Sequence, residues 1–74
     1  MNIWNFILSE AVCGDGHVLV VANGVEQATE LVHRWMKKQK MGSGWSIDKI
    51  LSLRCKSEHK RPKIISGLWT SHGT

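Results

Sequence analysis

A single amphipathic helix constrains the fold of this chain more than any other feature of its sequence. Between Val25 and Met36, apolar residues recur at three- and four-residue spacing and form one stripe on a helix. Asn23 and Glu26 have the spacing of a capping box, and Gly42-Ser43-Gly44 is a stop signal. The spacing therefore predicts a helix over about 24–41. The stripe consists of Val25, Ala28, Leu31, Val32, Trp35 and Met36.

Two strand-type segments lie on each side of this helix. Each is an alternating or β-branched run of apolar residues. The run Cys13-Gly14-Asp15-Gly16 predicts a hairpin turn between the first two. The chain is thus expected to be one domain over 1–74, with the element order ββαββ and a frayed tail at 70–74. The expected strands are 3–12, 17–22, 45–54 and 63–69.

Connection rules turn this order of elements into a sheet. The second strand, the helix and the third strand form a crossover, so these two strands run the same way. The first strand is apolar on both faces, which is typical of a central strand. The predicted fold is α+β: a four-stranded, mainly antiparallel sheet of order 2-1-3-4, with the amphipathic helix on one face.

Composition excludes several classes of protein. A chain of 74 residues has room for one core, and 42% hydrophobic with 22% charged residues is globular rather than disordered composition. No apolar run is long enough to span a membrane, and two cysteines are too few for a disulfide scaffold. The opening segment lacks a basic region and Glu10 interrupts it, which argues against a signal peptide. We expect a cytoplasmic protein.

Tryptophan supplies four of the five aromatic residues, and it points to an interface. Trp35 belongs to the helix stripe, whereas the other three lie on predicted strands. One helix covers one face of the sheet, so the other face is expected to expose apolar residues and to mark a homodimer, a higher homo-oligomer or a docking face. Core packing explains these tryptophans equally well. The interface candidates are Trp4, Trp45, Trp69 and Ile50.

The chain has a net charge of +4, and its basic residues are expected to cluster at two ends of the fold. One is the end where the helix begins, whose free N–H groups and nearby cations suit an anion. A solvated hairpin loop explains the same charges and is preferred. At the opposite end, the basic last turns of the helix lie near Trp45 and Trp69, a pairing used by single-stranded nucleic-acid binders. The anion-site candidates are Asn23, Gly24, Arg54, Lys56, His59, Lys60, Arg61 and Lys63.

Two Cys-x-x-x-His pairs raise the possibility of zinc. Cys13 with His17 and Cys55 with His59 could together supply four ligands. The predicted strand directions place the pairs roughly 25 Å apart, which argues against a shared metal or a disulfide. No phosphate-binding glycine loop, paired carboxylates or nucleophile–base arrangement is evident. We expect no cofactor and no enzymatic activity.

Two functions follow as hypotheses. The first is a small, non-catalytic, homo-oligomeric interaction module, of the adaptor or inhibitor type, similar in size to accessory proteins of phages and mobile elements. The alternative is a basic protein that binds nucleic acid or sequesters a small anionic nucleotide through the 54–63 loop and the helix N-terminus. Salt dependence separates the two, because phosphate binding weakens steeply with salt.

Overall fold

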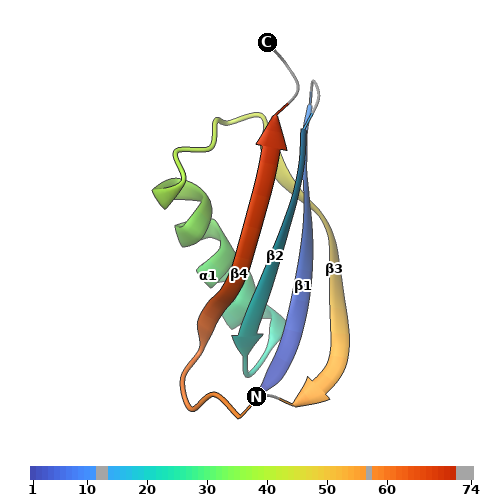
Figure 1. Cartoon of the computed structure of the whole chain (residues 1–74), viewed down its shortest axis with the longest axis vertical. Coiled ribbons are helices and arrows are strands. Elements are labelled where there is room, and N and C mark those ends of the chain that lie inside the picture. The colour runs from blue at the N-terminus through green and yellow to red at the C-terminus, as the bar shows by residue number, and fades with distance from the viewer. Residues whose placement is uncertain (12–13, 57, 72–74) are drawn as a thin grey trace.

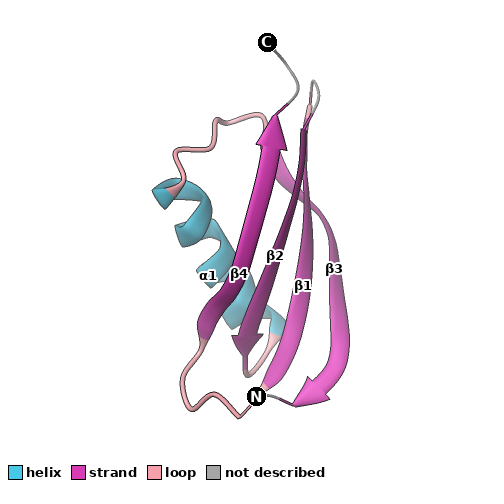
Figure 2. Cartoon of the chain, viewed as in Figure 1, coloured by secondary structure: helices cyan, strands magenta, loops and turns pink. Residues whose placement is uncertain are grey.

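The computed structural model describes residues 1–11, 14–56 and 58–71 as one open sheet with one helix (Figure 1). Figure 2 shows the helix, in cyan, behind one side of the sheet. The α+β class, the antiparallel sheet and the helix on one face are confirmed. In chain order the elements are β1 (Asn2–Glu10), β2 (Gly14–Ala22), α1 (Val25–Lys38), β3 (Trp45–Lys56) and β4 (Lys63–Ser71).

The order of the strands corrects the expected 2-1-3-4. The sheet runs β3-β1-β2-β4, and every neighbouring pair is antiparallel. β1 is central, as its two apolar faces predicted, but β4 pairs with β2 instead of with β3. The directions of the strands allow both places, because β4 is antiparallel to β2 and to β3. Beside β2, β4 lies against the helix, where Ile64 and Trp69 pack on the core.

The core lies between α1 and one face of the sheet. Its centre is made by Phe6 of β1, Val18 and Val20 of β2, and Ala28 and Val32 of the helix, all fully buried. Phe6 is the direct cross-strand partner of Val18. Cross-strand partners point to the same face of a sheet, so every second residue of β1 and β2 packs in this core.

The helix is shorter at both ends than its pattern predicted. It begins at Val25, because the N-cap is Gly24 rather than the candidate Asn23. It ends at Lys38, before the glycines, because Lys40 adopts a left-handed φ of 57°. Lys40 and Met41 then donate to the carbonyls of Lys37 and Met36, which is a Schellman motif.

Gly14 and Gly16, the two glycines expected in the hairpin turn, belong to β2 instead. A Cβ at Gly14 would lie 2.8 Å from the Trp45 ring, and one at Gly16 would lie 3.1 Å from the Cβ of Trp69. The missing side chains leave space in which Trp45, from one edge of the sheet, meets Trp69 from the other. At the end of the chain, Thr70 and Ser71 continue β4, where a frayed tail was expected.

Candidate functional site

The face of the sheet opposite α1 is the largest feature that the fold leaves open. Figure 1 looks onto this face, with the helix behind the sheet. We call it the uncovered face, and it is lined by Ile3, Asn5 and Ile7 of β1, Leu19 and Val21 of β2, Leu51 of β3 and Leu68 of β4. Successive side chains of a strand point to opposite faces, and cross-strand partners point to the same face. Each of these residues either follows or precedes a core residue on its own strand, or is the cross-strand partner of a residue that does, so all of them point away from the core.

Two apolar side chains on the edge strands of the uncovered face are strongly exposed. Leu68 is 75% exposed and Leu51 is 44% exposed, whereas Val21 is fully buried. Ile7 and Leu19 of the central strands are half-buried. Apolar residues from all four strands therefore form a patch that Asn5 and His17 interrupt, and exposed apolar patches are surfaces that proteins commonly use for association.

Asn5 lies in the middle of this patch, and its environment is unusual. Its direct cross-strand partners are Leu19 on one side and Leu51 on the other. Its side-chain oxygen Oδ1 is buried and has no hydrogen-bond partner among the described residues. An unpaired buried polar atom costs about 1–3 kcal/mol. The patch thus carries a polar group that the isolated chain leaves unsatisfied.

Polar and charged residues surround the patch. Lys49 on β3 pairs with Ile7, while Lys63 on β4 pairs with Val21. Asp15 is exposed on β2 toward the opposite end of the face from Lys63, whereas the exposed His17 lies within the patch, between its cross-strand partners Ile7 and Leu68. The face therefore mixes apolar and polar side chains, as protein–protein interfaces commonly do.

The tryptophans that were interface candidates lie on the other side of the sheet. Trp45 is 8% exposed and belongs to the core, and its ring centroid lies 5.4 Å from that of Trp69 in an edge-to-face arrangement. The indole N–H of Trp69 donates to Gln39 Oε1, and that of Trp4 donates to the Ala22 carbonyl oxygen. Ile50 pairs with Phe6, so it too points to the helix side, where it is 39% exposed.

The sequence therefore predicted an open apolar face, but the residues predicted to line it lie on the opposite face of the sheet. The residues it missed, Leu51 and Leu68, have no distinguishing local signal. Their significance depends on which of the two apolar faces of the strands the helix occupies.

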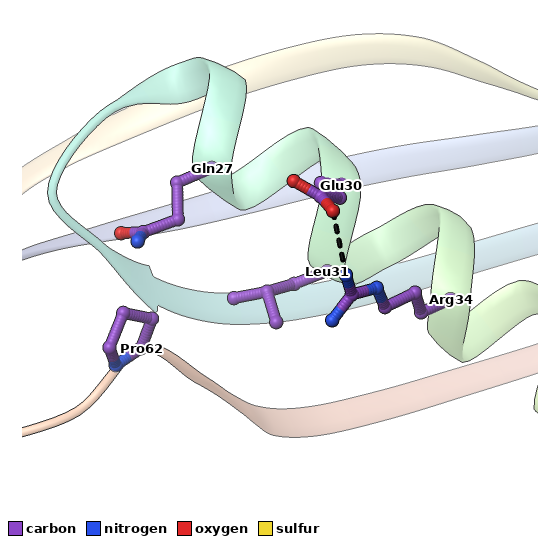
Figure 3. A pocket seen from close by; sticks show the side chains of 5 residues that line it. All are labelled: Gln27, Glu30, Leu31, Arg34 and Pro62. Carbon is purple, nitrogen blue, oxygen red and sulfur yellow. Dashed lines mark hydrogen bonds and ion pairs between the residues drawn. The ribbon is translucent and has the colours of Figure 1, made fainter.

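The cationic candidates gather at the end of the molecule where α1 begins. All of the basic ones are exposed side chains of the end of β3, the following loop and the start of β4. Pro62 of this loop reaches the first turns of the helix, where it lines a small cavity with Gln27 (Figure 3). The set is Arg54, Lys56, His59, Lys60, Arg61 and Lys63.

At the helix N-terminus, Gly24 provides no side-chain cap. The Asn23 backbone N–H donates to Gln27 Oε1 at 2.9 Å, so this side chain of the first turn reaches back over the helix start. Arg54 has a left-handed φ of 53° at an irregularity in β3, and its N–H contacts Ser52 Oγ at 3.4 Å.

The possible zinc ligands are only partly within the described residues. Cys13 and the side chain of Cys55 lie outside them. His17 pairs with Leu68, roughly 15 Å along β4 from its start at Lys63, whereas His59 precedes that start. Within the described part of the chain, no cluster of three or more His, Cys, Asp or Glu side chains could hold a metal.

Comparison with known proteins returns no relative of this chain. No protein-family model, no curated protein and no solved structure matches it. In the described residues, no helix is both long enough and apolar enough to cross a membrane.

Proposed function

We propose that this chain is a non-catalytic, cytoplasmic interaction module that self-associates through its uncovered face and binds a further protein. The observation that carries the proposal is the exposure of Leu68 and Leu51 on the sheet face that the single helix leaves open. The unpaired oxygen of Asn5 supports it, because a donor from a second chain on this face would satisfy that buried acceptor.

A second copy of the chain suits this face in shape and area. Two sheets pack face to face at a separation of about 10 Å, with interdigitating side chains. The molecule measures 40 × 21 × 18 Å, so the rectangle that bounds its broad side is on the order of 800 Å², an upper limit close to what each partner contributes to a standard interface. Identical faces also meet the symmetry requirement of a two-fold dimer.

Sedimentation equilibrium of the Leu68→Asp variant tests the self-association. The wild-type chain is expected to sediment at no less than twice its mass of 8.3 kDa, and the variant at 8.3 kDa. A charge at a buried contact is costly to desolvate even beside His17, the cross-strand partner of Leu68, so the dimer is lost. The fold is retained, because Leu68 is 75% exposed in the single chain.

Val25→Asp is the matched control for this experiment. Val25 is 40% exposed on the first turn of α1, away from the uncovered face, and an acidic residue there suits the helix dipole. This variant should associate like the wild type. A wild-type chain that sediments at 8.3 kDa across a concentration series into the millimolar range would exclude the proposal.

The alternative function, binding of an anionic nucleotide or nucleic acid, is favoured by one observation of its own. The exposed cations from Arg54 to Lys63 lie at the same end as a helix N-terminus that has no side-chain cap. The uncovered face itself offers no stacking platform among the described residues, since the aromatic residues lie on the helix side. At the end where the helix stops, Trp45 is buried and the Trp69 indole N–H donates to Gln39, so this alternative depends on the cations from Arg54 to Lys63.

A salt titration of Lys60→Glu/Arg61→Glu tests the alternative. Binding of a labelled single-stranded oligonucleotide, followed by fluorescence anisotropy, should weaken in the double variant. The slope of log affinity against log salt should become shallower by about 1.4 if both phosphate contacts are lost. Lys37→Glu/Lys40→Glu makes the same charge change at the far end of α1 and should leave the slope unchanged. Absence of binding by the wild type at low salt would eliminate the alternative.

A further inference from the structure

A groove between α1 and β4 is independent of the surfaces considered so far. Its walls are Leu31, Arg34, Trp35 and Lys38 of the helix and Ile64 of β4, and it has a volume of about 380 Å³. The smaller cavity of Figure 3, where Leu31 and Arg34 face Pro62, adjoins it. The two cavities share Leu31 and Arg34, so they lie next to each other along the helix.

The floor of the groove is apolar and contains an unused hydrogen-bond donor. Trp35 lies against β4 at Gly67, where a Cβ would come within 2.4 Å of the indole ring. Trp35 is half-buried, and its indole N–H makes no hydrogen bond within the described part of the chain. Leu31 and Ile64 complete an apolar surface beside this donor.

The rim of the groove is cationic. Arg34 forms an ion pair with Glu30 at 2.7 Å, and both side chains remain largely exposed (Figure 3). One turn further along the helix, Lys38 is exposed on the same wall. Between Leu31 and Lys40 the helix and its cap carry four cationic residues and no acidic one. A ligand in the groove therefore meets positive charge above an apolar floor.

The edge of the sheet supplies the third element of recognition. β4 is the last strand on its side, so the main-chain groups along its outer edge have no strand partner among the described residues. An extended peptide can add to such an edge as a further strand, and a helix beside the edge then packs on alternate side chains of the peptide.

We propose that this groove binds an extended acidic segment of a partner protein. The segment adds to β4 as a fifth strand, seats an apolar side chain on Leu31, Trp35 and Ile64, and places carboxylates against Arg34 and Lys38. Charge complementarity and the free strand edge select this occupant over a neutral or basic one. This inference rests on the proposed function, because the groove would be the surface on which the interaction module binds its further protein. The groove lies on the helix side of the sheet, so binding there does not depend on self-association through the uncovered face.

Peptide binding to the full chain tests the groove. The probe is a fluorescein-labelled peptide with leucine at its centre, aspartates two and four residues to either side, and threonines between them. Binding is followed by anisotropy, and the Trp35 indole N–H by NMR, with Trp35→Phe to assign its resonance. The acidic probe should bind and shift this resonance, whereas the same peptide with lysines in place of aspartates should not bind.

Two matched changes make the result specific. Lys38→Glu should weaken binding about tenfold or more, while Lys37→Glu, the same charge change on a residue outside the groove, should weaken it about twofold or less. N-methylation of alternate peptide nitrogens should abolish binding, because strand addition needs these N–H groups.

Three outcomes would overturn the proposal: no binding of the acidic probe, equal weakening by Lys37→Glu and Lys38→Glu, or undiminished binding of the N-methylated peptide. The measurements are repeated in the Leu68→Asp background. Peptide binding that persists there while the dimer is lost separates this site from the uncovered face.

Discussion

Replacing Phe6 with alanine is expected to remove a large part of the free energy of unfolding of this chain. The Phe6 side chain is fully buried at the centre of β1, beside Val18 and beneath the helix. Truncations of this kind cost about 3–5 kcal/mol, from lost burial and from the cavity left behind. A domain of this size has a total stability of about 4–11 kcal/mol, so one substitution removes much of it.

Urea denaturation followed by far-UV circular dichroism measures this effect. Ile50→Ala is the control, because Ile50 is the cross-strand partner of Phe6 on β3 but is 39% exposed. Its truncation should cost only about 1 kcal/mol, in proportion to the smaller area it buries. Equal costs for the two variants would show that the core is not centred on Phe6.

A methyl group at Gly67 is expected to destabilise the chain by about 1–3 kcal/mol, the usual cost of overpacking. The added Cβ would lie 2.4 Å and 2.7 Å from two carbon atoms of the Trp35 ring, so the indole must move away from β4. The expected result of Gly67→Ala is therefore a lower urea midpoint together with a shifted NMR resonance of the Trp35 indole N–H.

Gly42→Ala provides the comparison for Gly67→Ala. A Cβ at Gly42 would meet no atom within 4 Å, and its φ is not in the left-handed region. This change should leave both the midpoint and the Trp35 resonance where they are in the wild type. An unshifted Trp35 resonance in Gly67→Ala would contradict the close packing of the indole on β4.

The local elements were predictable because their signals are local. The stripe from Val25 to Met36 has helical spacing that no strand can use, and the alternation within β1 follows from the two-residue period of a strand. Element boundaries were less accurate. The helix ends at Lys38, and the left-handed residue that follows its C-cap is Lys40, at a position where sequence reasoning expects glycine.

The sequence predicted that one face of the sheet would be open and apolar, but it did not predict which residues line that face. One helix cannot cover both faces of a sheet, so an open apolar face was expected from the element count alone. Trp45 was assigned to that face because tryptophan is common at interfaces. In the structure it packs on the helix side, because Gly14 and Gly16 leave room there for its ring and for that of Trp69.

Sequence by itself determined the number, type and direction of the elements, since periodicity and connection rules act within short stretches of chain. Only the tertiary structure decided which edge of the sheet β4 joins and which face of each strand the helix covers. Both choices were open in the sequence, because β4 runs antiparallel to either possible neighbour and β1 is apolar on both faces. They were decided by side-chain volume: the glycines at 14, 16 and 67 accept indole rings on one face, and this leaves Leu51 and Leu68 exposed on the other.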